Sequence, residues 1–359
     1  MENINLVRHS YKGDCIFLLK DLTDKIKEIT IEEKEELIRS GVSYSEMISK
    51  ESIPSKDIKN IFLNILNRDK KLIAYYVAKI SEIIYRQKGN KLVIVSLARA
   101  GTPYGILIKR YLKLKYKVDI PHYSISIIRG KGIDANALKY ILTENKKAEI
   151  QFVDGWTGKG SITKELNKSI DIFNNENKTN IDNSLAVISD PAKLCKVCGT
   201  REDFGIATCC LNSTVSGLIS RTIHNEKYIG KDEFHGAKTL YYLKDEDYSQ
   251  YFIDKIDNEF KKISIKYEDL VLENIDKEYS MKIVSKIREL YDVNNINNIK
   301  LSVGESARVL LRRDPRVVLV KNKSDKNIEH ILKLAEEKGV KVIEYKDSEY
   351  NCISIINER

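Results

Sequence analysis

The sequence predicts an α/β protein with a central parallel sheet, a helical region before it and a small α/β unit after it. Two observations in the middle of the chain favour this fold class. Short β-rich runs alternate with glycine turns and helical stretches, and these runs are continuously apolar, as in strands covered on both faces. A third observation, helices and strands alternating again over residues 296–359, predicts the separate C-terminal unit.

Residues 1–90 are expected to form an N-terminal helical region. Apolar residues recur at three- and four-residue spacing in Ile31–Arg39 and Ile58–Ile84, which predicts two helices. Thr30 can cap the first of them, and the glutamates that follow lie in its first turn, where the helix dipole favours acids. The polar segment Ser40–Lys50 predicts a turn between the two helices.

Residues 91–245 are expected to hold the core sheet. Its strands are predicted at Leu92–Leu97, His122–Ile128, Ile150–Val153 and Leu185–Ser189. Residues 246–295 are charged and without a clear breaker, which predicts a helical connector.

Residues 296–359 are expected to form the small α/β unit. A left-handed residue at Gly339 would end its longer helix. The predicted elements are helices at Ser306–Arg313 and Asn327–Lys338, and strands at Arg316–Val320, Val340–Tyr345 and Cys352–Ile356.

Composition narrows the protein class. Charged residues make up 31% and apolar residues 42%, a globular balance. No apolar run reaches the roughly 18 residues of a membrane span, and the first residues carry charges where a signal peptide is apolar. We therefore expect a cytoplasmic protein with no membrane partner, whose six cysteines are reduced. The net charge of +9 is spread along the chain, which favours a lysine-rich surface over a dedicated polyanion site.

The loop Val153–Ser161 (VDGWTGKGS) is the strongest local signal. An apolar strand runs into Asp154, then into a loop with three glycines, and then into a helix. Glycines let backbone N–H groups turn inward, and a helix N-terminus adds donors and a positive dipole end. The loop therefore predicts an anion cradle, although it lacks the Lys-Ser/Thr pair of a Walker A motif.

A second loop, Ser96–Gly105 (SLARAGTPYG), follows the first predicted core strand. Gly101 and Pro103 predict a tight turn, and Arg99 places a cation at the sheet edge where open α/β sheets bind ligands. The alternative is an ordinary turn with a surface arginine.

These loops resemble a known family. SLARAGTP, HYSISIIRGKG and VDGWTGKGS, in that order, are similar to type I phosphoribosyltransferases. With SYKGDCIFLLKDL, SGVSYSEM, LNSTVSGLISRT and DEFHGAK, residues 10–245 resemble the phosphoribosyltransferase-like proteins of bacterial tellurium-resistance and stress operons. That family is also labelled a StiP-type cysteine protease.

The resemblance implies a PRPP-dependent transferase that joins a base or nucleotide to ribose 5-phosphate, or runs in reverse. Mg²⁺ would accompany the diphosphate, with no metal ligated directly by the protein. Val153 stands where the family has a first acid, so catalytic activity is left open, and Asp190 is a substitute acid. The implied catalytic residues are Asp154, Arg99, Arg129 and Lys131, and the implied PRPP contacts are Ala100, Gly101, Thr157, Gly158, Lys159, Gly160, Ser161 and Asp190.

Two alternatives stay open for residues 10–245. One is a non-catalytic PRPP or nucleotide sensor coupled to RNA. The other is a cysteine peptidase that uses Cys210 as nucleophile and His235 as base, a pair that must meet in space. His235 equally fits a buried structural histidine.

Zinc ligation is a less favoured interpretation of the cysteines than plain buried thiols. Cys195 and Cys198 have metal-ligand spacing, but adjacent Cys209 and Cys210 are awkward for one tetrahedron.

The C-terminal unit resembles a pelota-type RNA-binding domain through GESARVLLRRDPRVVLV and LAEEKGVKVIEY. The resemblance implies RNA as a partner, while a solvated helix face is the alternative for its basic residues. The arginines implied to contact RNA are Arg308, Arg312, Arg313 and Arg316. The sequence leaves the acceptor base and the oligomeric state undetermined.

Overall fold

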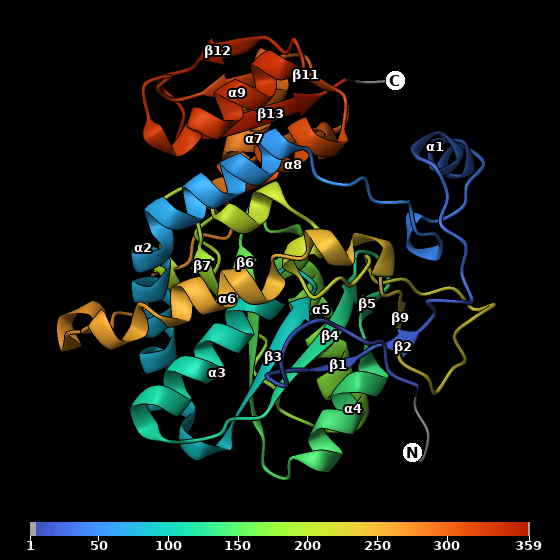
Figure 1. Cartoon of the computed structure of the whole chain (residues 1–359), viewed down its shortest axis with the longest axis vertical. Coiled ribbons are helices and arrows are strands. Elements are labelled where there is room, and N and C mark those ends of the chain that lie inside the picture. The colour runs from blue at the N-terminus through green and yellow to red at the C-terminus, as the bar shows by residue number, and fades with distance from the viewer. Residues whose placement is uncertain (1–4, 358–359) are drawn as a thin grey trace.

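The main sheet of the computed structural model, which describes residues 5–357, has parallel strands in the order β1-β4-β3-β6-β7-β8 (Figure 1). A short strand, β5, pairs antiparallel with β4. The strands span β1 Ile16–Leu18, β3 Leu92–Ala98, β4 His122–Ile128, β5 Gly132–Ile133, β6 Glu149–Trp156, β7 Leu185–Ser189 and β8 Val197–Thr200. The structure confirms all four core strands expected from the sequence. Their continuous apolar pattern arises because strands covered on both faces bury side chains on both sides of the sheet.

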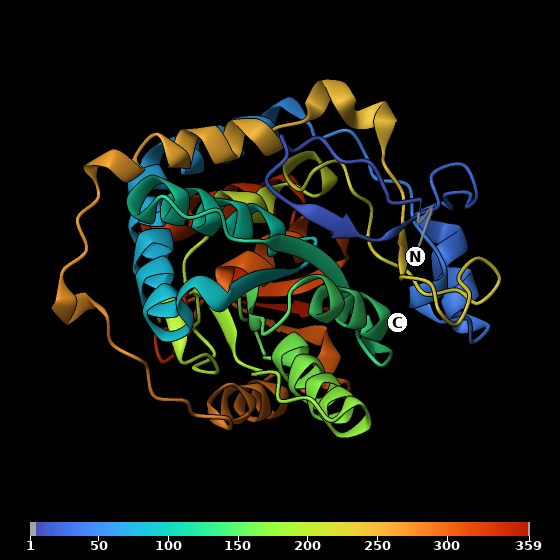
Figure 2. The same cartoon turned by 90° about the horizontal axis from the view of Figure 1, so that it is seen from below.

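Helices cover both faces of this sheet (Figures 1 and 2). One apolar cluster joins the sheet to α2 and α3, and another joins it to α4 and α5. A further helix, α6, packs on α2 and α3. These helices span α2 Lys56–Lys88, α3 Thr102–Tyr116, α4 Ala135–Glu144, α5 Ser161–Asn177 and α6 Ser249–Asp257.

The N-terminal region combines a capped helix with edge strands. The helix α1 (Ile31–Arg39) begins at Thr30, whose hydroxyl accepts a hydrogen bond from the Glu33 backbone N–H at 3.1 Å, so the predicted cap is confirmed. The same region also supplies β1 and β2 (Lys20–Asp21), and β2 pairs with β9 (Gly236–Ala237). The sequence did not predict these strands, since two or three residues are too few for a periodic signal.

The C-terminal unit is a four-stranded sheet in the order β10-β13-β11-β12, in which only β11 and β12 are parallel. The helix α7 packs on one face of this sheet, while α8 and α9 pack between its other face and the core. The elements span α7 Tyr279–Leu290, β10 Ile299–Leu301, α8 Val303–Arg312, β11 Pro315–Val320, α9 Glu329–Glu337, β12 Val342–Glu344 and β13 Cys352–Ile356. The chain is therefore a mixed α/β fold, mostly parallel, with a small C-terminal α/β region.

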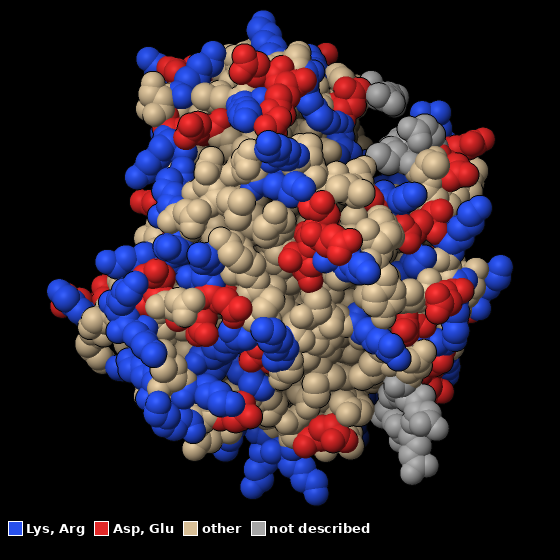
Figure 3. Space-filling view, viewed as in Figure 1, with Lys and Arg blue, Asp and Glu red and all other residues tan. Residues whose placement is uncertain are grey.

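Two surface properties bear on function. No helix within residues 5–357 is long and apolar enough to cross a membrane. Lysines and arginines are interspersed with acids over the face in Figure 3, so the net charge of +9 forms no single positive field on that face.

A buried carboxylate ties the C-terminal unit to the core. Asp203 follows β8, and its two carboxylate oxygens accept backbone hydrogen bonds from Val303 at 2.9 Å, Asn351 at 2.9 Å and Cys352 at 3.3 Å. Val303 is the first residue of α8, so this contact sets where α8 begins against the core. Burial raises the pKa of Asp203 to about 7, against the opposing effect of these hydrogen bonds.

We expect the free energy of unfolding of the Asp203→Asn protein to depend less on pH than that of the parent protein. The folded carboxyl holds its proton up to a pKa of about 7, whereas an unperturbed aspartate has a pKa of 3.8. Between these values the folded state binds more protons, so stability falls as the pH rises. Thermal melts of both proteins across this range measure the effect. An unchanged slope in the variant would contradict this account of Asp203.

Candidate functional site

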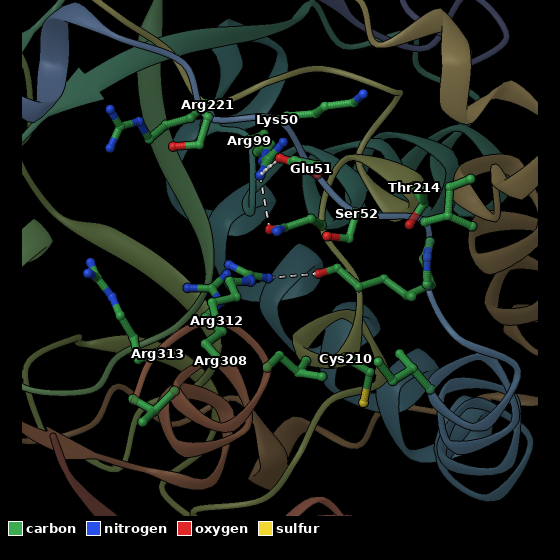
Figure 4. A pocket seen from close by; sticks show the side chains of 18 of the residues that line it. Lys50, Glu51, Ser52, Arg99, Cys210, Thr214, Arg221, Arg308, Arg312 and Arg313 are labelled. Atoms are coloured by element: carbon green, nitrogen blue, oxygen red, sulfur yellow. Dashed lines mark hydrogen bonds and ion pairs between the residues drawn. The ribbon is translucent and has the colours of Figure 1, made fainter. Parts of the chain in front are cut away.

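A cavity of about 420 Å³ lies where the C-terminal unit meets the core (Figure 4). Helix α8 and the short helical turn Ala207–Cys210 pack on each other at its base. The cavity is lined by Cys210, by five arginines and by two glutamates: Arg99, Arg221, Arg308, Arg312, Arg313, Glu51 and Glu305.

Cys210 lies at this wall, with the thiol of Cys209 behind it. The sulfurs of Cys209 and Cys210 are 3.9 Å apart and both are buried. A hydrogen bond from the Cys210 thiol lowers the pKa of Cys209 to about 5, against the opposing effect of burial, and the neighbouring His330 lowers it further. The same hydrogen bond, together with burial, raises the pKa of Cys210, so Cys209 is the more readily ionised thiol of the pair.

The imidazole of His330 comes from α9 of the C-terminal unit. The residue is 4% exposed, and neither ring nitrogen has a hydrogen-bond partner within bonding geometry. A buried polar atom without a partner is costly, so this ring is a strong candidate for a functional role. Gly205 makes room for it, since a Cβ there would lie 2.5 Å from Cε1 and 2.7 Å from Nε2 of His330.

A second thiol–imidazole contact lies in the core. Cys15 Sγ lies 3.7 Å from Nε2 of His122. Burial raises the pKa of Cys15 and lowers that of His122 to about 3, so both groups are neutral at physiological pH. His122 is also held by Ser96 at 2.8 Å and by the Asp14 carbonyl at 3.1 Å. This contact has the character of a satisfied structural histidine.

The predicted base His235 lies in a different environment from Cys210. Its Nδ1 is 2.9 Å from Ser126 Oγ, and its ring packs on His224 with centroids 4.9 Å apart. Burial lowers its pKa to about 3, helped by His224 and Lys131. The electrostatic surroundings of Cys209 include His330 and not His235, so the structure offers His330 as the imidazole beside the thiol pair.

The predicted anion cradle forms a second cavity of about 180 Å³ at the N-terminus of α5. Burial raises the pKa of Asp154 to about 6 and lowers that of Lys159 to about 8. Predicted residues that line this cavity are Ala100, Arg129, Asp154, Thr157, Gly158, Lys159, Gly160 and Ser161.

Other predicted transferase residues lie outside the cradle. Arg99 lines the larger cavity instead, and Gly101 caps α3, where a Cβ would lie 2.2 Å from the Val153 carbonyl. Asp190 is buried, pairs with Arg201 and accepts a hydrogen bond from Thr157. Lys131 lines a shallow groove beside Glu165.

The C-terminal unit covers the cradle with a negative group. A Cβ at Gly158 would lie 3.0 Å from Glu305 Cγ, so this glutamate packs directly on the glycine loop. Its charge is paired with Arg308 at 3.1 Å, and Lys300 of the same unit also lines this cavity. Within residues 5–357 no group of three or more His, Cys, Asp or Glu side chains could hold a metal ion.

Three of the four arginines expected to contact RNA face the larger cavity, namely Arg308, Arg312 and Arg313. Arg308 pairs with Glu305 at 3.1 Å and stacks on Trp156 at 4.3 Å. Arg316 lies outside the cavity, exposed on β11, and donates to the Tyr291 carbonyl at 3.0 Å.

Sequence reasoning missed His330. It is an isolated histidine on an amphipathic helix, and no local motif distinguishes it from a buried structural residue. Only tertiary packing, in which α8 contacts both α9 and the Ala207–Cys210 turn, brings it to the thiols.

The comparisons with known proteins agree with a thiol-based site. Residues 9–257 match the family of the tellurite-like stress resistance cysteine protease StiP, and residues 278–358 match the PELOTA RNA binding domain. The relative named Cysteine protease StiP, from Acinetobacter baylyi, is 33% identical over 365 residues, covering 97% of this chain and 94% of its own length.

These matches overturn the prediction of a phosphoribosyltransferase. Both the family and its curated relative are described as cysteine proteases, and neither description contains a transfer from PRPP. Loop patterns were the basis for inferring the transferase, its PRPP substrate and the associated Mg²⁺. The glycine loop by itself indicates only an anion cradle in this fold. The likeness to stress-resistance proteins is confirmed.

Proposed function

The chain belongs to the StiP family of stress-resistance cysteine proteases, and from that premise we propose that it hydrolyses peptide bonds with Cys210 as nucleophile. One observation carries the choice of residues. The sulfurs of Cys209 and Cys210 lie 3.9 Å apart, the pKa of Cys209 is lowered with the help of His330, and Cys210 lines the cavity of about 420 Å³. The core pair Cys15 and His122 does not line this cavity, and burial raises the pKa of Cys15.

The proton transfers follow from the order of the three groups. His330 helps to hold Cys209 as the thiolate, and this thiolate accepts the proton of Cys210 across the 3.9 Å contact. The Cys210 thiolate attacks the carbonyl carbon, forming a C–S bond as the carbonyl electron pair moves to oxygen. Collapse of this intermediate breaks the C–N bond, and the leaving amine takes the proton back through the same relay. Water then hydrolyses the thioester, with His330 as the base.

The residues that follow Cys210 can stabilise the developing oxyanion. Asn212 lines the cavity, and its Oδ1 accepts a hydrogen bond from Arg99 at 2.9 Å, which leaves the amide Nδ2 as a donor. Arg99 is fixed by Glu51 at 2.6 Å. Burial raises the pKa of Glu51, but Arg99 and the hydrogen bonds from Ser213 bring it below its ordinary value, so the pair is ionised.

Two finer predictions remain proposals. The type I phosphoribosyltransferase-like form of the sheet is supported by its parallel strand order and by the glycine loop before α5. RNA as a ligand of the C-terminal unit is supported by the match of residues 278–358, with Arg316 the exposed candidate contact.

A labelling experiment tests the proposed function. The full-length protein is treated with iodoacetamide at pH 6, where an ordinary thiol is almost fully protonated. We expect one label in the Cys209–Cys210 pair before any other cysteine reacts, with peptide hydrolysis lost in parallel. The other four thiols are internal controls, because burial raises the pKa of each and none of them has a neighbour that lowers it as in Cys209. Hydrolysis that persists after full modification of the pair would contradict the proposal.

A further inference from the structure

Arginines and lysines outnumber acids in the lining of the cavity beside Cys210. Five arginines from two parts of the chain face it: Arg99 and Arg221 from the core, and Arg308, Arg312 and Arg313 from α8 and the residue after it (Figure 4). Arg308 and Arg312 are four residues apart on α8, so they share one face of that helix. The only acids in the lining, among the described residues, are Glu51 and Glu305.

The two acids are already paired. Glu51 binds Arg99 at 2.6 Å, and Glu305 binds Arg308 at 3.1 Å. Arg312 donates to the Leu211 carbonyl at 3.3 Å, and it makes no ion pair within residues 5–357. Desolvation lowers the pKa of Arg312, and the charges of Arg308 and Arg99 lower it further.

Arg221 is a second arginine of the lining whose charge is opposed by neighbouring arginines. Desolvation lowers its pKa to about 10, and Arg99 and Arg313 oppose its charge. Its guanidinium donates to the carbonyls of Tyr44 and Met47 rather than to a carboxylate. Among the described residues, the cavity lining thus holds more cations than acids.

We propose that this cavity binds an acidic side chain of the polypeptide substrate next to the scissile bond, with Arg312 as the cation that pairs with it. This inference rests on the proposed function and adds a substrate class to it. The fork of a guanidinium matches a carboxylate with two parallel hydrogen bonds. Because the Leu211 carbonyl that holds Arg312 directly follows Cys210, the bound acid would lie beside the reacting carbonyl.

The dimensions and charges of the site favour a peptide over RNA. A volume of about 420 Å³ holds a few side chains rather than a duplex or a long single strand. Glu51 and Glu305 in the same lining tolerate one carboxylate but repel a run of phosphates. Aromatic side chains that could stack bases are absent from the described lining.

Two alkylating reagents test the cation without any substrate. Iodoacetate and iodoacetamide are nearly the same size and both label a thiolate, but only iodoacetate is anionic. We expect the iodoacetate-to-iodoacetamide rate ratio at Cys210 to fall about tenfold or more in Arg312→Gln at low salt. Arg86→Gln removes an arginine outside the cavity and should keep the ratio of the parent protein.

Peptide binding separates this inference from the proposed function. In the Cys210→Ala protein, a labelled peptide containing Glu should bind about tenfold or more tightly than its Gln analogue, and Arg312→Gln should remove the difference. If neither alkylating reagent labels Cys210, the proposed function fails while the peptide comparison still decides the inference. Equal binding of the two peptides overturns the inference. Two competitors are then added to the bound Glu peptide: an oligoribonucleotide, and an excess of a second Glu-containing peptide of different sequence. Displacement by the oligoribonucleotide alone would assign the cavity to RNA instead.

Discussion

Replacing Cys210 with alanine is expected to lower peptide hydrolysis by about 10³-fold or more while the protein stays folded. Alanine cannot form the C–S bond, so only the binding and polarising groups of the cavity remain. The side chain is small and lies at a cavity wall, so its loss costs little packing compared with the burial of a whole apolar residue. Hydrolysis of a fluorogenic peptide, with a thermal melt of the same sample, measures both effects.

Cys198→Ala is the matched control for this variant. Cys198 is also buried, but burial raises its pKa to about 12 and it does not line the cavity. We expect the Cys198→Ala protein to cleave peptides at the rate of the parent protein. A Cys210→Ala protein that retains the parent rate would refute the nucleophile, and loss of activity only in Cys209→Ala would move that role to Cys209.

Replacing His330 with asparagine is expected to lower hydrolysis by about 10²- to 10⁴-fold at neutral pH. The same change should move the alkylation of the thiol pair to higher pH, because the ring helps to hold the pKa of Cys209 at about 5. A merely structural histidine would alter stability without moving this titration. The pH profile of iodoacetamide labelling is therefore the decisive measurement.

Gly205→Ala provides an independent test of the same ring. The added methyl would lie 2.5 Å from Cε1 of His330, so the imidazole must move while its chemistry stays intact. We expect the labelling profile to shift in the same direction as in His330→Asn. His224→Gln is the control, since that ring packs on His235 and does not line the cavity. A labelling profile unchanged in both His330→Asn and Gly205→Ala would exclude His330 from the thiol chemistry.

The parts of this fold that sequence could predict are those with a strong local cause. Leu92–Leu97 is apolar because both faces of β3 are buried, and Thr30 caps α1 through a bond to a residue three positions away. Gly339 likewise ends the helical stretch with a positive φ of 64°. Each of these features depends on residues that are close together in the sequence, so the sequence pattern alone predicts it.

The candidate site depends on contacts that sequence does not encode locally. Cys210 could be named as a nucleophile from residue type, but its base could not, because α9 reaches the turn only after two parts of the chain pack together. The arginines Arg308 and Arg312 were expected on a free surface, and α8 instead directs them into the cavity. The glycine loop before α5 has the local form of a phosphate site, although the family to which the chain belongs is described by a different chemistry.

The order of the proposed catalytic residues along the chain has a consequence for synthesis. The thiol pair leaves the ribosome well before His330 and before the α8 arginines that complete the cavity. A growing chain would therefore hold its nucleophile without the base that deprotonates it, and without the wall that would hold an acidic substrate. If the proposed function holds, the growing chain would cleave no neighbouring nascent chain until its own C-terminal unit has docked.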